Sequence, residues 1–251
     1  MNADDSKMPL MDHLRELRRR VMTSAAVVVV CTAVAYFFSE RIFAWLVRPM
    51  NEALVTTGAG TLAIVGAMEG ITVQLKLSGV AGLFFASPVV FWQVWRFVAP
   101  GLYDAEKRWV LPLVAASTTL FAGGALFCYY VVFQLGFPVF LTMTPENVEA
   151  VLSIDSYLGM ALTLLVTFGG SFQLPIVVYF LARLGLIDHI DMIKGFRYSV
   201  VAIAVVAAVL TPPDVMSQVL MAIPLIILYI ASIGVARIFT TKIRPPAGAL
   251  A

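Results

Sequence analysis

The sequence has few charged residues. Asp, Glu, Lys and Arg make up 13% of its 251 residues, whereas 61% are hydrophobic. Soluble proteins average about 25% charged and about 45–50% apolar residues, so this composition excludes an ordinary soluble domain. The surplus of apolar side chains must face a solvent other than water, which indicates an integral membrane protein.

The side chains that carry most enzyme chemistry are also scarce, with two histidines and two cysteines. His13 and His189 lie near the ends of apolar runs, so no histidine within a run could serve a zinc site or a serine protease. Cys31 and Cys128 lie inside apolar runs, where a thiol usually packs as a small hydrophobe, and neither has metal-ligand spacing around it. The phosphate-binding motif G-x-x-x-x-G-K-[ST] is missing. We therefore expect no enzyme activity, no metal and no cofactor.

The apolar residues fall into six segments, each judged against the roughly 20 residues that a helix needs to cross about 30 Å of hydrocarbon. The segments cover residues 21–38, 77–98, 110–133, 157–182, 198–210 and 217–238. The fifth has only 13 residues. At 1.5 Å per residue it reaches about 20 Å, so we expect it not to cross a full-thickness bilayer. These lengths predict an all-α membrane protein whose fifth and sixth helices are short.

Basic residues gather on one side of the predicted membrane. Six spans place both termini on the same side, and 14 of the 17 Lys and Arg residues lie there with them. The other side holds only Arg41, Arg48 and Lys76. Because Lys and Arg accumulate in cytoplasmic loops, this distribution predicts that both termini are cytoplasmic.

Prolines interrupt or border several spans. Pro175 lies in the fourth segment shortly after Gly169 and Gly170, where it removes a helical hydrogen bond and predicts a kink. Further prolines in or beside spans are Pro88, Pro112, Pro138 and Pro224. Bent helices favour a curved, concave array. We find no inverted or tandem repeat, which disfavours the plan of many secondary transporters.

Four motifs occur in a fixed order among these spans. They read PLMDHLRELRRR at 9–20, FWQVWRFVAPGLYDAEKR at 91–108, FGGSFQLP at 168–175 and LTPPDVMSQ at 210–218. Their order, spacing and placement among the six spans extend over nearly the whole chain, and together they resemble TatC, the multi-spanning receptor component of the twin-arginine protein translocase. Two departures concern acids: many members carry a glutamate in place of Gln173, and many carry one where Ile230 follows Tyr229 here. A mechanism based on acid titration within the membrane therefore gains no support from the resemblance.

The resemblance implies a single membrane domain over residues 1–251, built as a curved array of six helices in the bacterial cytoplasmic (inner) membrane. It implies a receptor for the twin-arginine signal peptides of folded proteins. It also implies partners of the TatA/TatB type, which are single-span membrane proteins, several copies in one complex, and export driven by the proton-motive force. Nucleic acid is not an expected partner. The alternative is a secondary transporter or channel for a small solute, which would need a continuous polar path across the spans.

Two glutamates are candidates for reading the paired arginines. A carboxylate binds a guanidinium through directional, charge-assisted hydrogen bonds, so two adjacent arginines call for separate acids on one face. The resemblance places Glu16 at the signal-binding surface, and Glu106 lies in the short loop between the second and third spans. The competing interpretations are an i,i+4 ion pair of Glu16 with Arg20 and a solvated loop acid at position 106.

An apolar group accompanies these acids. Phe97 could pack the apolar residues that follow the twin arginines, with Leu102 and Tyr103 beside it. The same three residues could instead end the second helix and anchor it at the membrane interface, where Tyr is common. We include Arg20 with this signal-binding set.

Several other residues have structural or partner-binding interpretations. Gln173 lies about 15 Å from the end of the fourth span and needs a hydrogen-bonding partner, because lipid supplies none. That partner is either another helix or a group in a translocation recess. Asp214 fits an N-cap for the sixth helix. The set expected to be structural or to contact a partner helix comprises Pro49, Pro212, Pro213, Asp214 and Gln218.

Overall fold

The structure is a computed structural model that describes residues 8–58, 60–98, 110–142, 151–210 and 215–239. Within these ranges, six helical segments are long and apolar enough to cross a membrane, as the sequence predicts. The helices of the six spans run through α1 (Met8–Phe37), α4 (Glu69–Val98), α5 to α6 (Val110–Phe127 and Phe133–Thr142), α7 to α8 (Ile154–Ser171 and Leu174–Arg183), α9 (His189–Leu210) and α10 (Val215–Phe239).

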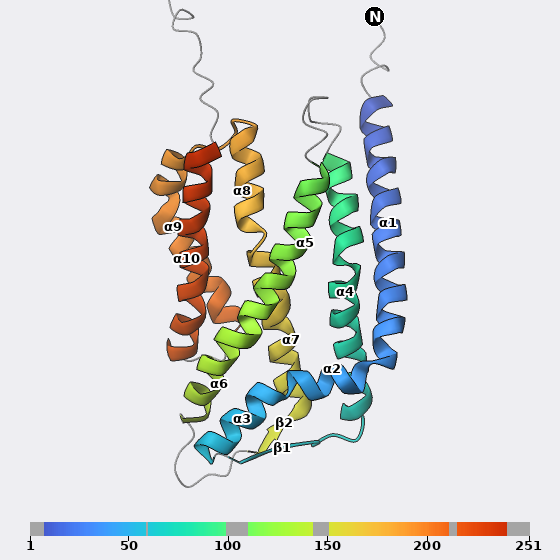
Figure 1. The fold of residues 1–251 in the computed structure, drawn as a ribbon, viewed down its shortest axis with the longest axis vertical. Helices are drawn as coiled ribbons and strands as arrows, with labels where there is room; N and C mark the ends of the chain where they lie inside the picture. The colour runs from blue at the N-terminus through green and yellow to red at the C-terminus, as the bar shows by residue number, and fades with distance from the viewer. Residues whose placement is uncertain (1–7, 59, 99–109, 143–150, 211–214, 240–251) are drawn as a thin grey trace, which may run out of the picture.

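The helices extend beyond the apolar segments, and this overturns one prediction. α9 begins at His189 and has 22 residues, which reach about 33 Å. The expectation that the fifth segment cannot cross a bilayer is therefore wrong. The charged residues Asp191, Lys194 and Arg197 occupy its first turns, so they lowered the hydropathy without ending the helix. The fifth and sixth spans remain the shortest of the six, and in Figure 1 they end above the level of α6 and the strands.

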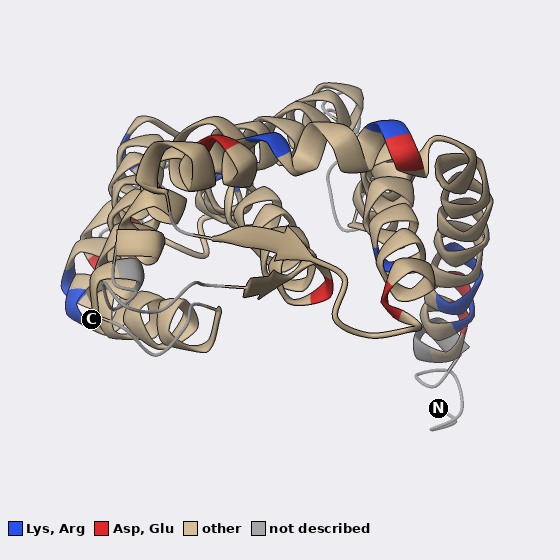
Figure 2. Cartoon of the chain, turned by 90° about the horizontal axis from the view of Figure 1, so that it is seen from below, with Lys and Arg blue, Asp and Glu red and all other residues tan. Residues whose placement is uncertain are grey.

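The fourth span is broken where Pro175 predicts a kink. α7 ends at Ser171 and α8 begins at Leu174, with Pro175 in the first turn of α8. The third span also departs from α-helix, because one turn of π-helix (Cys128–Val132) joins α5 to α6. Viewed along the helices, the spans lie on a curve that is open on one side (Figure 2). This arrangement agrees with the concave array expected from the prolines.

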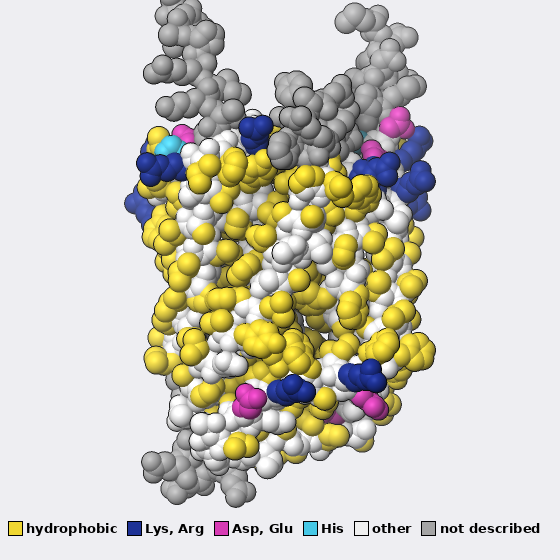
Figure 3. Space-filling view, viewed as in Figure 1, with side chains coloured by type: hydrophobic (Ala, Val, Ile, Leu, Met, Phe, Trp, Pro, Cys, Tyr) yellow, Lys and Arg dark blue, Asp and Glu magenta, His cyan; other side chains and the backbone are white. Residues whose placement is uncertain are grey.

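The two longer connections form an ordered cap at one end of the molecule. The first contains α2 (Ser39–Leu46), α3 (Arg48–Thr57) and β1 (Thr61–Ala63), and β1 pairs in parallel with β2 (Val151–Ser153). We call this the cap end. The opposite end, where α1 begins and α8 and α10 finish, is called the basic end because Lys and Arg side chains gather there (Figure 3).

Glu69, at the start of α4, holds the cap together. Its carboxylate accepts hydrogen bonds from the backbone amides of Val65, Gly66 and Asp155 at 2.6, 2.9 and 2.7 Å. The hydroxyl of Ser153 donates a further bond at 2.5 Å. Lys76 adds an ion pair to Asp155 at 2.8 Å. The cap therefore joins α4 to α7, and this buried carboxylate has a structural role.

Close packing of α1 against α4 positions the candidate site. A Cβ atom at Gly82 would lie 2.6 Å from the backbone of Thr32, so only glycine permits this approach. With the helices in contact at this point, the basic half of α1 runs beside the last turns of α4. Residues 13–20 and 93–97, which are distant in sequence, therefore face one another.

Candidate functional site

Glu16 and Arg20 form the polar centre of the basic end. They lie one turn apart on α1, and Arg20 donates from Nε, at 3.0 Å, and from Nη2 to Oε1 of Glu16. Nη1 of Arg20 donates to Oε1 of Gln93 on α4 at 3.2 Å. The Arg20 side chain is only 16% exposed, whereas that of Glu16 is 35% exposed. The predicted i,i+4 pair is thus present, and it also links the two helices.

The pair leaves half of the Glu16 carboxylate available. Both bonds from Arg20 end on Oε1, and Oε2 has no hydrogen-bonding partner among the residues that the structure describes. Arg20 therefore fixes the orientation of the carboxylate without saturating it. A guanidinium from outside could approach Oε2 from the exposed side of α1.

An aromatic pair lies next to this carboxylate. The rings of His13 and Phe97 stack with their centroids 4.3 Å apart and their planes 19° apart. Phe97 is half-buried and is the second-last residue of α4. The structure thus brings Glu16, Arg20 and Phe97 together, as expected. Glu106, Leu102 and Tyr103, the remaining members of the predicted set, lie outside the described residues.

Gln93 is a site residue that sequence analysis missed. It lies one helical turn before Phe97, so the two share the face of α4 that packs on α1. This i,i+4 relation was the available signal, since a polar residue on the same face as a candidate binding residue needs a partner of its own. The tertiary structure supplies that partner, Arg20, from a helix more than seventy residues away in sequence.

A second polar network crosses the interior of the spans. The Trp95 indole donates to the hydroxyl of Ser117 at 2.8 Å, and Nε2 of Gln173 donates to the carbonyl of Ser117 at 2.9 Å. Ser117 is 1% exposed. Gln173 therefore makes the interhelical bond that was one of its two expected roles. Together these bonds join α4, α5 and the break between α7 and α8.

The residues expected to be structural or to contact a partner divide into two groups. Gln218 donates from Nε2 to the carbonyl of Ala204 at 3.0 Å, which ties α10 to α9, and Pro49 is buried in the first turn of α3. Both therefore have structural roles. Pro212, Pro213 and Asp214 lie outside the described residues.

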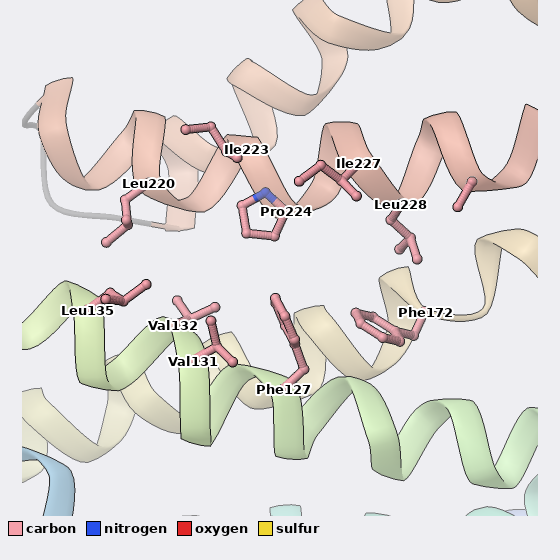
Figure 4. A pocket seen from close by; sticks show the side chains of 11 residues that line it. Phe127, Val131, Val132, Leu135, Phe172, Leu220, Ile223, Pro224, Ile227 and Leu228 are labelled. Carbon is pink, nitrogen blue, oxygen red and sulfur yellow. The ribbon is translucent and has the colours of Figure 1, made fainter.

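The hollow beside α10 is apolar. One cavity of about 390 Å³ lies between α10 and the third span, where Leu135 and Phe127 face Leu220 and Pro224 across the gap (Figure 4). Such a lining offers no acid, base or nucleophile. Within the described ranges no group of three or more His, Cys, Asp or Glu residues could hold a metal ion. The groups that the basic end does bring together, a carboxylate beside an arginine and two stacked rings, are suited to contacts with charge and with apolar surface.

Comparisons with known proteins agree with this geometry. The family model for Sec-independent protein translocase protein (TatC) matches residues 12–224. A protein named TatC from Desulforapulum autotrophicum is 42% identical over 243 residues, covering 96% of this chain and 89% of the relative. Another, from Helicobacter pylori strain J99, is 39% identical and covers 91% and 88%. The crystal structure of a twin-arginine translocase receptor, TatC, superimposes with a TM-score of 0.82 at 37% identity, covering 91% of this chain and 100% of that one.

Removing the hydroxyl of Ser117 should destabilise the packing of α4 on α5. The variant Ser117→Ala leaves the buried Trp95 indole without its acceptor, at a cost of about 1–3 kcal/mol. We expect a lower thermal unfolding midpoint in detergent, measured by the fluorescence of the purified protein. Thr163→Val is the matched control, since the exposed Thr163 hydroxyl bonds only to the carbonyl of Gly159 in its own helix. Equal midpoints for both variants would show that the Trp95 bond contributes nothing.

Proposed function

The chain belongs to the TatC family and is a receptor component of the twin-arginine translocase in the bacterial inner membrane, and we propose that it reads the paired arginines of signal peptides through Glu16 and Glu106. The family is a component of a protein translocase. We propose further that this chain acts as a receptor on folded cargo and catalyses no covalent step, with export driven by the proton-motive force.

The orientation of the Glu16 carboxylate is the observation that carries the proposal. Arg20 holds it in place and is itself bonded to Gln93, and Oε2 remains without a partner among the described residues. A carboxylate that is already ordered loses less entropy when it binds a guanidinium than a mobile one does. The stacked rings of His13 and Phe97 lie beside it and offer an apolar surface for the residues that follow the arginines.

The ends of neighbouring helices support a role for Glu106 as the second acid. α4 ends at Val98 and α5 begins at Val110, both at the basic end, so the connection that contains Glu106 starts and finishes on the side of Glu16. Two acids on the same side of the membrane are what a pair of adjacent guanidinium groups requires. The hydrogen bond from Trp95 to Ser117 holds the last turns of α4 against α5.

The alternative function, a solute transporter or channel, has no support from the polar side chains of the spans. The hydroxyls of Ser78, Thr118 and Ser232 donate to carbonyls one turn back in their own helices. Gln173 is engaged with Ser117. A polar path would need side chains that are free to exchange partners with a passing solute.

Removing either glutamate should abolish or severely weaken binding of a twin-arginine peptide. We expect Glu16→Ala and Glu106→Ala each to lower affinity on the order of tenfold or more, because each loses a charge-assisted pair. Glu106→Arg should be worse, since it adds repulsion. Affinities for twin-arginine and twin-lysine peptides, measured on protein reconstituted in nanodiscs, give the comparison.

Gln173→Ala is the matched control for both glutamate variants. Its side chain bonds to Ser117 within the spans, away from the basic end, so it should leave the preference for arginine largely intact. If the glutamate variants keep the wild-type ratio of arginine to lysine affinities, these carboxylates are not the readers.

We propose that both termini and the basic end face the cytoplasm. Among the described residues, Arg41, Arg48 and Lys76 are the basic residues on the cap side, and the others lie towards the basic end. Cysteine at Val55, which is 85% exposed on α3, should react with an impermeant maleimide added outside intact cells. Cysteine at Lys194 should react only after the membrane is opened. The background should lack Cys31 and Cys128, and labelling of both sites in intact cells would contradict six spans.

The pair α9 and α10 is our proposed docking surface for partners of the TatA/TatB type. Val201, Val205 and Val209 form an apolar stripe at intervals of four residues on α9, and all three are more than half exposed. A stripe of this spacing suits the side of another membrane helix. Several copies of the chain and its partners would form one complex.

Crosslinking tests this surface with two positions on the same helical pair. Photo-crosslinking residues at Val205, which is 58% exposed, should capture a single-span partner in native membranes. Met221 of α10 is the other position at which the sequence predicts a crosslink to a partner, but it is 2% exposed and faces the core, so that choice is wrong. It serves as the internal control and should capture no partner. Crosslinks found only from α1 and the third span would place the partner elsewhere.

A further inference from the structure

An apolar slot opens between α4 and α5 at the cap end. The two helices are held together towards the basic end by the stacked rings of Phe84 and Phe121, whose centroids are 4.6 Å apart. Towards the cap they diverge, and Figure 1 shows α5 slanting away from α4. Leu162 and Leu165 of α7 close the back of the slot, and α2 crosses its lower end. The result is a recess of about 500 Å³ that is lined almost entirely by apolar atoms.

The depth of the slot corresponds to one leaflet. On α4 its lining runs from Leu77 to Phe85, which is eight steps along the helix or about 12 Å. Half of a hydrocarbon core about 30 Å thick is about 15 Å. The Phe84 and Phe121 rings therefore close the slot near the middle of the bilayer, while α2 lies at the level of the interface.

Arg41 places a positive charge at the mouth of this slot. It is exposed on α2, and its guanidinium makes no ion pair or hydrogen bond with any residue that the structure describes. Lys76 is also basic and lies at the cap end, but its charge is paired with that of Asp155. A guanidinium beside an apolar recess in a membrane matches an amphiphile with a phosphate group and an acyl chain, because guanidinium binds phosphate through paired hydrogen bonds.

We propose that the slot binds one phospholipid from the leaflet at the cap end, with an acyl chain between α4 and α5 and its phosphate on Arg41. The volume lies within the range of about 300–1,000 Å³ found for ligand pockets. The bound lipid would fill the space between the two helices and brace the spans that carry Gln93 and Ser117.

Lipid retention by the purified protein tests the proposal. Native mass spectrometry would count bound phosphatidylglycerol on the delipidated protein after titration. We expect Arg41→Gln to weaken binding about tenfold, the effect of losing one charge-assisted contact. Ala122→Phe, which fills the slot from α5, should weaken it at least as much. Dioleoylglycerol has the acyl chains without the phosphate and should bind to wild type about as weakly as phosphatidylglycerol binds to Arg41→Gln.

Matched controls separate a built site from lipid that coats the whole surface. Arg48→Gln removes an exposed arginine of the cap outside the slot, and Ala44→Phe enlarges an exposed alanine of α2 that does not line it. Both should retain phosphatidylglycerol as wild type does. Wild-type retention by Arg41→Gln, or equal losses in Arg48→Gln, would overturn the proposal. So would a photo-crosslinker at Ala122 that captures a protein instead of lipid in native membranes.

Discussion

Water is absent from the hydrocarbon core, and the rest of the structure depends on that constraint. Every backbone amide and carbonyl within the bilayer needs a partner inside the protein, so the spans must be helical. The same demand extends to polar side chains. It explains why the hydroxyls of Ser78 and Ser232 bond to their own helices and why the indole of Trp95 reaches Ser117 on a neighbouring span.

The break in the fourth span shows how this constraint produces tertiary structure. The α-helix is interrupted between Ser171 and Leu174, in a place where lipid cannot satisfy exposed polar groups. The amides of Phe172 and Gln173 still donate to carbonyls of the preceding turn, whereas Pro175 has no amide to donate. Gln173 lies in that break, and its amide donates to a carbonyl of α5. An amide serves there without ionising, which is consistent with a chain that has no glutamate at this position. The break therefore becomes a point of attachment between helices.

At the basic end the side chains meet water, and the physics changes. Water can solvate charged side chains there, yet Arg20 remains largely buried because it bonds to both Glu16 and Gln93. This arrangement uses one charged side chain to order another. The narrow contact at Gly82 sets the distance between the two helices, so the order of the site depends on packing deep within the membrane. Recognition and fold are coupled through α1 and α4.

Composition, the six apolar segments and the prolines determined the membrane class, the number of spans and the kink at Pro175. These follow from local properties, since length, hydropathy and proline act on the segment that contains them. The candidate acids came instead from the family resemblance of the four motifs. Helix ends were harder to predict, because residues such as Asp191 and Lys194 continue a helix whose apolar part is shorter. Only the tertiary structure decided that Gln93 supports Arg20, that Ser117 joins three helices and that α4 and α5 enclose a slot beside Arg41. The physical reason is that each of these contacts unites residues from different helices, and their partners are set by packing that no single segment encodes.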